Sequence, residues 1–389
     1  MPAYYKLLEA LNKENDVEAL CLGKVGHDGI EIREVFRFSN LERIQFHIVP
    51  HRKTRLFGRH LGNIANEILQ LFYTFKVVFR ERPDVIYVDR IHIVYGAILS
   101  VFFGKKVVVR LYGVASLLKR FRGLRKWLKE PVRYLSYKAP FSHVICTKDG
   151  SGARYFIEHF MNRNIPYEIL LNGVDKDIKL ASQVGQMNPL RQRYGIAGDH
   201  KIILFVSRLD DRKGARRFAD ALCELAKKNK KFFAVVVGDG KLRKTLQEDT
   251  AKSDIKDHIS FEGAVDHDAI YAYYSMADIY VSLNFLGNLC NTVLEAINAG
   301  KCIVTFKKDP LDHTDDDTEA FLAGNAVLID KRRIMEELPN VLEGLINDDS
   351  RIRSMEEGAV RSSKMLPSWN ERIEREIKLL ERVGQNGQA

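Results

Sequence analysis

ADIYVSLNFLGNLCNTVLEAINAGKCIVT, residues 277–305, alternates apolar strands with an amphipathic helix. The pattern predicts a strand over 278–283, a loop rich in Gly and Asn, a helix that starts near Asn291, and a strand over 302–305. In an open parallel sheet, this order places the loop and the helix start at the carboxyl edge of the strands, where ligands bind. The unpaired N–H groups of a helix start suit an anion such as a diphosphate.

Glu295 is the one carboxylate near this helix start. Thr292 stands three residues before it, so the pair fits a capping box that satisfies two helix-start donors. The other interpretation is a contact with the ligand at the same edge of the sheet.

Composition indicates a chain of ordinary globular character. Its 389 residues can form two domains with full cores, and 46% hydrophobic and 29% charged residues are typical of a soluble protein. There is no apolar run of about 18 residues and no secretory signal, so we expect no membrane-spanning helix. The five cysteines are scattered and form no C-x-x-C pair. This favours a reducing cytoplasm over a disulfide framework or a zinc site.

The net charge of +10 is unevenly distributed. Residues 1–175 carry 28 Lys and Arg against 17 Asp and Glu, whereas the remainder carries 33 against 34. A basic half beside a neutral half indicates that one half faces an anionic surface, either nucleic acid or anionic lipid.

Apolar strands alternate with helices on both sides of the opening stretch, which predicts parallel, doubly wound sheets. In the first half we expect helices over 4–11 and 61–80 and strands over 17–22, 44–49, 84–88, 107–111 and 143–147. In the second half we expect strands over 202–207, 232–237 and 259–261. Polar residues 177–200 fit a hinge between two domains.

Several ordered motifs resemble the donor-site signature of family 4 glycosyltransferases. They are Asn172-Gly173-Val174-Asp175, Ser207-Arg208-Leu209, Arg212-Lys213-Gly214, Gly238-Asp239-Gly240, Ser282, Leu294-Glu295-Ala296 and Ala299-Gly300. The resemblance implies an α/β GT-B fold, in which two Rossmann-like domains face each other across a cleft. The expected domains are 1–172 on the acceptor side and 173–365 for the nucleotide sugar, with 366–389 as a helix that crosses back.

The resemblance also implies the site. Arg208 and Lys213 would grip the donor diphosphate, whose charge grows in the transition state and is stabilised by fixed cations. Glu295 would act with them and hold the ribose hydroxyls. The remaining donor-binding positions implied are Gly238, Gly263, Val265, Asn288, Asn291 and Thr292.

Two departures from the family pattern stand out. The family has a second Glu eight residues before the position of Glu295, but here that position is Gly287. The amides of Asn284, Asn288 and Asn291 are the candidates to replace it. Members of the family also open with an apolar strand and a Gly-rich loop, which this sequence lacks. Either its start is truncated or the protein dispenses with that loop. Tyr112 stands where relatives often carry His, and its role is left open.

Residues 116–141 combine apolar positions at helical spacing with many Lys and Arg. Pro131 should divide the helix. One interpretation is an interfacial membrane helix in which Phe121, Leu124, Trp127 and Leu128 insert. The other is a helix of the domain with a solvated basic face.

The run Asp315-Asp316-Asp317 could suggest a metal site. Enzymes with the GT-B fold generally need no bound metal, so a solvated acidic loop is the preferred interpretation.

The resemblance implies a retaining glycosyltransferase, and we expect one of surface polysaccharide biosynthesis. It would move a sugar from a UDP- or GDP-linked donor, with no other cofactor, to a lipid-linked or glycan acceptor. We expect it in the cytoplasm, as a peripheral protein on the anionic inner face of the cell membrane. The alternatives are a degenerate GT-B protein that binds nucleotide sugar or a partner, and a GT-B sugar-nucleotide epimerase. Nucleic-acid binding ranks last because no known module is present.

Overall fold

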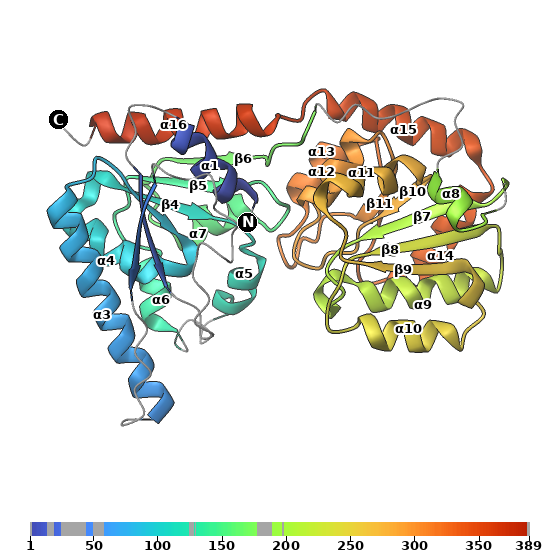
Figure 1. Cartoon of the computed structure of the whole chain (residues 1–389), viewed down its shortest axis with the longest axis horizontal. Coiled ribbons are helices and arrows are strands. Elements are labelled where there is room, and N and C mark those ends of the chain that lie inside the picture. Colours follow the sequence, from blue (N-terminus) through green and yellow to red (C-terminus); the bar gives the residue numbers. More distant parts are fainter. Residues whose placement is uncertain are drawn as a thin grey trace.

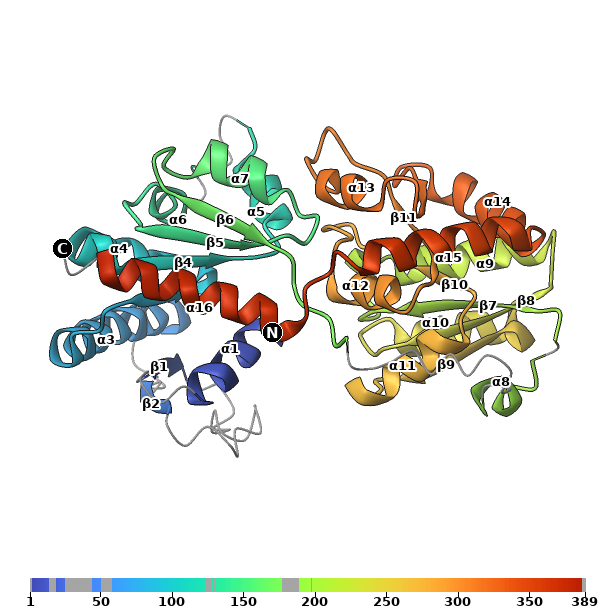
Figure 2. The ribbon, with the colours of Figure 1, turned by 90° about the horizontal axis from the view of Figure 1, so that it is seen from above.

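The structure is a computed structural model that describes residues 2–13, 19–24, 44–49, 58–123, 128, 130–176, 189–196 and 198–386. Two lobes of strands and helices lie side by side (Figure 1). The chain passes from the first lobe to the second, and its last helix, α16 (Trp369–Asn386), returns to lie along the first (Figure 2).

The first domain contains two parallel sheets, one with the order β1-β2 and one with the order β3-β4-β5-β6. Its elements are α1 (Pro2–Lys13), β1 (Ala19–Lys24), β2 (Ile44–Val49), α3 (Gly58–Glu81), β3 (Ile86–Asp89), η1 (Arg90–His92), α4 (Ile93–Phe103), η2 (Gly104–Lys106), β4 (Val107–Leu111), α5 (Ala115–Phe121), α6 (Pro131–Ser136), β5 (His143–Thr147), α7 (Ala153–Phe160) and β6 (Tyr167–Leu170). The strands predicted over 44–49, 107–111 and 143–147 are confirmed with the same bounds. The sequence did not predict α4, α7 or β6.

Strand β4 shows how the four-stranded sheet is covered on both faces. Successive side chains of a strand point to opposite faces. Val107 and Val109 therefore join the core beneath α4. Val108 packs against Leu379 and Val383 of α16. The returning helix thus closes one face of the first domain.

The second domain contains one six-stranded parallel sheet with the order β12-β11-β10-β7-β8-β9. Its elements are α8 (Pro189–Arg193), β7 (Lys201–Val206), η4 (Asp211–Lys213), α9 (Ala215–Ala226), β8 (Phe232–Val237), α10 (Arg243–Ala251), η5 (Lys256–His258), β9 (Ile259–Gly263), α11 (His267–Met276), β10 (Ile279–Val281), α12 (Asn291–Asn298), β11 (Cys302–Phe306), α13 (Asp316–Leu322), β12 (Val327–Ile329), α14 (Ile334–Ile346) and α15 (Asp349–Ser363). From β7 the chain builds the sheet first toward β9 and then from β10 toward β12. The order therefore reverses between β7 and β10, and ligands bind outside the carboxyl ends at such a point.

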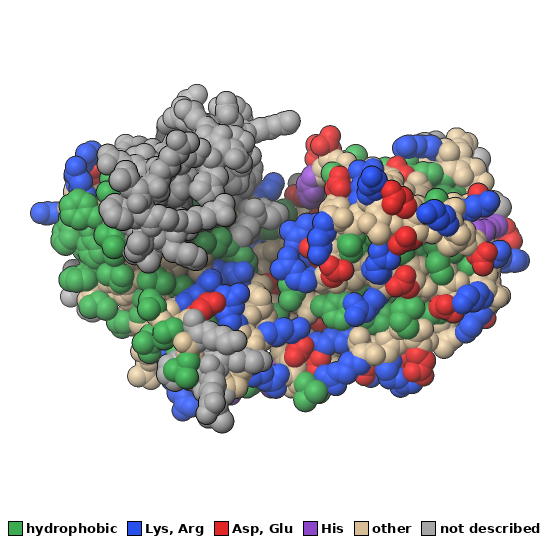
Figure 3. Space-filling model, turned by 90° about the horizontal axis from the view of Figure 1, so that it is seen from below, with side chains coloured by type: hydrophobic (Ala, Val, Ile, Leu, Met, Phe, Trp, Pro, Cys, Tyr) green, Lys and Arg blue, Asp and Glu red, His purple; other side chains and the backbone are tan. Residues whose placement is uncertain are grey.

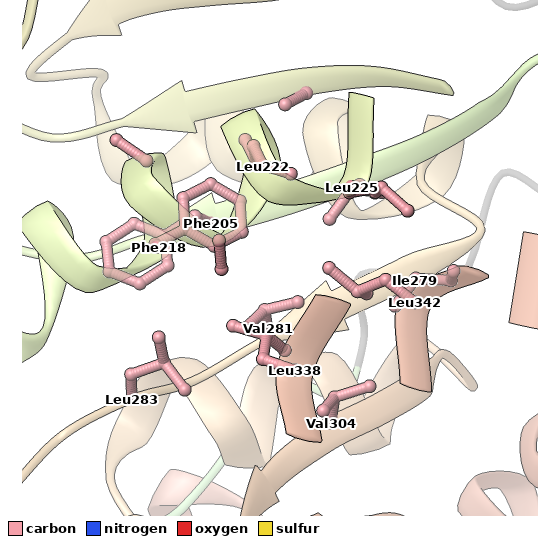
Figure 4. Packing of buried hydrophobic residues seen from close by; sticks show 14 of the residues in the cluster. Phe205, Phe218, Leu222, Leu225, Ile279, Val281, Leu283, Val304, Leu338 and Leu342 are labelled. Carbon is pink, nitrogen blue, oxygen red and sulfur yellow. The ribbon is translucent and has the colours of Figure 1, made fainter. Parts of the chain in front are cut away.

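The core beneath this reversal point is tightly packed (Figure 4). The ring of Phe205 on β7 stacks on that of Phe218 on α9, with centroids 4.7 Å apart. Val281 of β10 and Leu338 of α14 belong to the same buried cluster. Each such side chain stabilises the fold by about 1.5–3 kcal/mol. The ends of β7 and β10 are consequently held on a rigid base.

The basic segment over 116–141 differs in part from its prediction. Pro131 is the first residue of α6, so the expected division of the helix is confirmed. Phe121, however, is buried against Tyr137 and Phe156, so the prediction that it inserts into a membrane is wrong.

The other three residues of that prediction have different positions. Leu124 and Trp127 lie outside the described residues, and Leu128 is exposed. Of the helices that the structure describes, none is both long enough and apolar enough to cross a bilayer.

Candidate active site

The loops that follow β7 and β10 form one surface at the reversal point. The N–H of Phe285 donates to the carbonyl oxygen of Arg212 at 2.9 Å. Gly214 has a φ of +75°, and a Cβ there would lie 2.5 Å from the Cβ of Leu283. Only glycine allows both this conformation and this approach. The Gly that follows Lys213 in the sequence therefore joins the two loops.

Asp210 organises the basic residues of the loop after β7. Its buried carboxylate accepts hydrogen bonds from the backbone N–H of Lys213 at 3.1 Å and from Nε of Arg208 at 2.8 Å. Burial is the largest single influence on the pKa of Asp210 and would raise it, but the hydrogen bonds from Arg208 and Lys213 and the charges of Arg208 and Arg212 together lower it. Arg208 is thus fixed in orientation. The ammonium of Lys213 has no ion-pair partner within the described part of the chain, so it is free to bind an anion.

A small recess lies between the two loops, and the start of α12 opens onto it. Its polar lining consists of Ser207, Lys213, Ser282, Asn284, Cys290 and Thr292. α12 begins after Cys290, and no side chain of the described residues caps it there. The unpaired first N–H groups of α12 and the cation of Lys213 therefore indicate that the recess suits an anionic ligand.

Glu295 lies in the second turn of α12 and is not part of a capping box. The cap of the helix is Cys290, so Thr292 already lies inside the first turn. The carboxylate instead accepts a hydrogen bond from the hydroxyl of Tyr274 at 3.0 Å. Burial raises the pKa of Glu295 to about 7, although the bond from Tyr274 opposes the shift.

Two glycines let the loops after β7, β8 and β9 approach one another. Gly238 has a φ of +130°, and a Cβ there would collide with the carbonyl oxygen of Ser207. Its N–H donates to the carbonyl oxygen of Gly263 at 2.7 Å. Val265 follows two residues later and packs against the core of the domain. The structure therefore brings Gly238 and Gly263 to the same edge as Ser207.

The amides proposed to replace the absent carboxylate are engaged in this structure. Asn288 is buried, and its amide makes four hydrogen bonds, which involve Ser282, Asn284 and Asp315. An amide side chain can make no more than four. Asn284 bonds to Gly287 and Leu286 within its own loop.

Asn291 accepts a bond from Asn172 at 2.7 Å, and this bond links the two domains. The contacts of Asn288 and Asn291 with the donor remain predictions. What the structure shows is that these side chains hold the loop in place.

Gly287 lies directly against the first domain. It has a φ of +121°, and a Cβ there would lie 2.5 Å from the carbonyl carbon of Gly150 and 2.6 Å from the nitrogen of Ser151. The N–H of Leu289 also donates to the carbonyl oxygen of Asp149 at 3.2 Å. A carboxylate side chain at residue 287 would therefore force the two domains apart.

The prediction of a solvated acidic loop is wrong for Asp315, which is buried at this same contact, whereas Asp316 is exposed. Its N–H donates to the carbonyl oxygen of Gly150 at 2.7 Å, and its carboxylate accepts from the N–H of Asn288 at 2.6 Å and from the hydroxyl of Thr318 at 2.8 Å. Burial raises the pKa of Asp315 to about 7. The residues that the structure describes include no group of three or more His, Cys, Asp or Glu arranged for a metal ion. The loop therefore acts as a contact between the domains.

The strand ends of the first domain carry a second polar group of side chains. The hydroxyl of Tyr112 donates to Asp89 at 3.1 Å, and the guanidinium of Arg90 lies 4.6 Å from the centre of the Tyr112 ring. Arg90 also donates to the carbonyl oxygen of Gly113 at 2.7 Å, and the N–H of Gly113 donates to Asp149 at 2.6 Å. Burial raises the pKa of Tyr112 to about 12, so its hydroxyl stays protonated.

Two residues of the site were missed by sequence reasoning. Asp210 lies within a recognised motif, and an Asp just before a turn is a common cap, so its position was a usable signal. Tyr274 gave no such signal, because an aromatic residue in an apolar helix is read as part of the core. Its contact with Glu295 joins residues 21 positions apart on different helices.

Comparisons with known proteins find glycosyltransferases similar to this chain. Residues 186–361 match the family model described as glycosyl transferases group 1. The 2-deoxystreptamine glucosyltransferase of Streptomyces kanamyceticus is 26% identical over 140 residues, 36% of this chain and 36% of that protein. The match thus spans about a third of that relative's length.

Two longer similarities cover most of the chain. The GalNAc-alpha-(1->4)-GalNAc-alpha-(1->3)-diNAcBac-PP-undecaprenol alpha-1,4-N-acetyl-D-galactosaminyltransferase of Campylobacter jejuni is 22% identical over 308 residues, 78% of this chain and 74% of that protein. The crystal structure of Anabaena Alr3699/HepE in complex with UDP and glucose superposes with a TM-score of 0.71. The superposition covers 98% of this chain and 96% of that one at 19% identity, which shows a shared fold.

Proposed function

Because residues 186–361 match the model of the glycosyl transferases group 1 family and the chain has the GT-B fold, we propose that the protein transfers a sugar from a nucleoside diphosphate donor. The acceptor is a lipid-linked or glycan molecule at the inner face of the cell membrane. The anomeric configuration is retained and the product enters surface polysaccharide. The undecaprenol-linked acceptor named for the Campylobacter relative and the basic first half of this chain support this acceptor class.

The observation that carries the proposal is the convergence of three groups at the reversal point of the second sheet. The free ammonium of Lys213 and the uncapped start of α12 border one recess, and Glu295 follows on the same helix. When the bond from the sugar to the diphosphate breaks, negative charge develops on the leaving diphosphate. Lys213, Arg208 and the helix start stabilise that charge more strongly than the ground state, and this lowers the barrier.

Glu295 would fix the nucleoside end of the donor. An ionised carboxylate accepts hydrogen bonds from both ribose hydroxyls, and Tyr274 sets its orientation. Asp89 and Tyr112 stand at the strand ends of the first domain, where the carboxylate of Asp89, held by the hydroxyl of Tyr112, would accept a hydrogen bond from the incoming hydroxyl. The acceptor thus approaches from the first domain and the donor from the second.

Gly287 favours one alternative. Since a carboxylate cannot be placed there without separating the domains, the chain lacks a group that the family uses beside the sugar ring. A protein that binds nucleotide sugar without transferring it would show the same substitution.

A turnover assay separates the two functions. The full chain is incubated with radiolabelled UDP- and GDP-sugars and an undecaprenyl-diphosphate-linked saccharide or a membrane lipid extract. An enzyme converts label to a lipid-extractable product, and R208A abolishes most of this conversion. If the protein binds a donor but yields no product with any acceptor, the binding function replaces the enzyme.

A further inference from the structure

The outer surface of the first domain is apolar where α3 faces away from the sheet. On its inner side α3 buries Val77 and Val78. On its outer side it exposes Phe72 and Phe79, with 70% and 60% of their surface accessible. A helix that is apolar on both sides typically packs against the protein core with one side and against a membrane or a partner protein with the other.

The neighbouring helix α4 extends the same surface. Phe102 is 65% exposed, and its ring packs edge-on against Phe75 of α3 with centroids 5.3 Å apart. Phe79 and Phe103 make a similar contact at 5.3 Å. The exposed rings of Phe79 and Phe102 are therefore supported by the partly buried rings of Phe75 and Phe103.

Helix α6 packs beside α4 and carries further exposed aliphatic side chains, Val132 and Leu135. Together, Phe72, Phe79, Phe102, Val132 and Leu135 are called the apolar underside. Figure 3 shows hydrophobic side chains gathered over this face of the first domain, whereas charged side chains are interspersed over the second.

Positive charge accompanies the apolar underside. Lys76 is exposed on α3 between Phe72 and Phe79, and Arg80 remains 72% exposed although it pairs with Glu81. The half of the chain that contains this surface has an excess of 11 basic residues. Apolar side chains flanked by cations are the pattern of a surface that lies on an anionic bilayer.

We propose that the apolar underside docks on an anionic lipid bilayer, with Phe72, Phe79 and Phe102 inserted between the headgroups. The purpose of this docking rests on the proposed function, because it would bring the strand ends of the first domain to a lipid-linked acceptor. A second copy of the chain fits the surface less well. In a two-fold dimer the same patch faces itself, so the cations of Lys76 and Arg80 from both copies would gather at one interface.

The test is co-sedimentation of the full chain with vesicles of phosphatidylglycerol and phosphatidylcholine, with phosphatidylcholine vesicles as the neutral comparison. The variant is F72S/F79S/F102S. The matched control is L311S/M335S/M365S, which removes three exposed apolar side chains from the second domain. We expect the control to sediment like the wild type. The variant should partition at least tenfold more weakly, because each buried Phe contributes at least about tenfold.

F72S alone keeps the test valid if the triple variant fails to fold, since the Phe72 side chain is mostly exposed and its loss leaves the core intact. It should weaken partitioning by roughly tenfold. The proposal is overturned if the wild type does not sediment with anionic vesicles, or if F72S and the triple variant sediment like the wild type. A wild-type dimer that F72S converts to a monomer would also overturn it. UDP and GDP binding, measured on the same samples without lipid, reports separately on the donor site.

Discussion

Glu295 is a carboxyl group that the fold holds close to its point of ionisation. It lies against Tyr274, and the surrounding groups also include His267 and Asp175, which is the hydrogen-bond partner of that histidine. Because burial is the largest influence on it, its pKa of about 7 lies well above the ordinary value of 4.5. A ligand that donates hydrogen bonds to the carboxylate must favour its ionised form. As pH increases through 7, affinity for the donor should therefore rise, whereas the contribution of Glu295 to folding stability should fall.

The first prediction concerns E295Q and the donor. In the wild type, affinity for a UDP- or GDP-sugar should rise as pH increases through 7, because the carboxylate forms. In E295Q the affinity should be independent of pH and about tenfold weaker at pH 8 than in the wild type, which corresponds to one lost charged hydrogen bond. Titration calorimetry across this range measures both. A nucleotide sugar suits the experiment because its diphosphate diester does not titrate there.

The second prediction concerns the stability of the same variant. A carboxyl whose pKa is raised by folding stabilises the folded state below pH 4.5, and this contribution is lost as pH rises through 7. The glutamine of E295Q does not titrate. The difference in melting temperature, E295Q minus wild type, should therefore increase from pH 5 to pH 8. Asp315 titrates in both proteins, so its contribution to the melting temperature cancels in the difference. A difference that stays constant with pH would show that the carboxyl of Glu295 is not perturbed.

At the scale of elements, the contact between the acidic loop and the loops after β5 and β10 defines how the domains meet. Asp315 contributes its N–H and its carboxylate to this contact, and Gly150 and Gly287 let the backbones approach. In the third prediction, D315N lowers the melting temperature by an amount equivalent to about 1–3 kcal/mol of unfolding free energy. Either orientation of the new amide sets its NH2 group against an N–H donor of Asn288.

D316N is the matched control, because Asp316 lies next in the sequence but is exposed. It should melt like the wild type. If D315N and D316N melt alike, the buried carboxylate does not hold the contact.

The fourth prediction concerns the residue that departs from the family pattern. G287E should not increase turnover, since its side chain meets the backbone of Gly150 and Ser151. It should lower stability by roughly 1–3 kcal/mol more than G324E. Gly324 also has a positive φ, +74°, but no atom lies within 4 Å of a Cβ there, so this control has a left-handed backbone without the collision. Greater activity in G287E would show that a carboxylate can be accommodated.

The sequence predicts those parts of the fold and of the site that depend on residues close to one another in the chain. β4 and β5 are buried apolar runs, and the motif around Lys213 places a basic loop after β7. The burial of Asp315 could not be predicted, because its partner Gly150 is 165 positions away in the other domain and a run of Asp is ordinarily solvated. Phe121 was misassigned for a similar reason: helical spacing shows that a face is apolar but not whether protein or lipid covers it.

At the scale of the whole molecule, the two domains divide the proposed reaction between them. The second holds the loops, the helix start and the cation that suit a nucleoside diphosphate. The first holds the basic excess and the apolar underside that suit a membrane. The returning helix α16 and the contact at Asp315 join the two. The proposed transfer of a sugar depends on the recess beside Lys213 being a diphosphate site.

Calorimetric titration of UDP and GDP tests most directly whether this recess is a diphosphate site. The titration compares the full-length wild type, K213A and K244A. Lys244 is a highly exposed lysine on α10, so K244A controls for the loss of one charge. We predict that at least one nucleotide binds the wild type and K244A equally. It should bind K213A about 10- to 100-fold more weakly with an unchanged melting temperature, as expected for one lost charged contact of about 1.5–3 kcal/mol. Equal affinity for the wild type and K213A, or binding of neither nucleotide, would contradict the account.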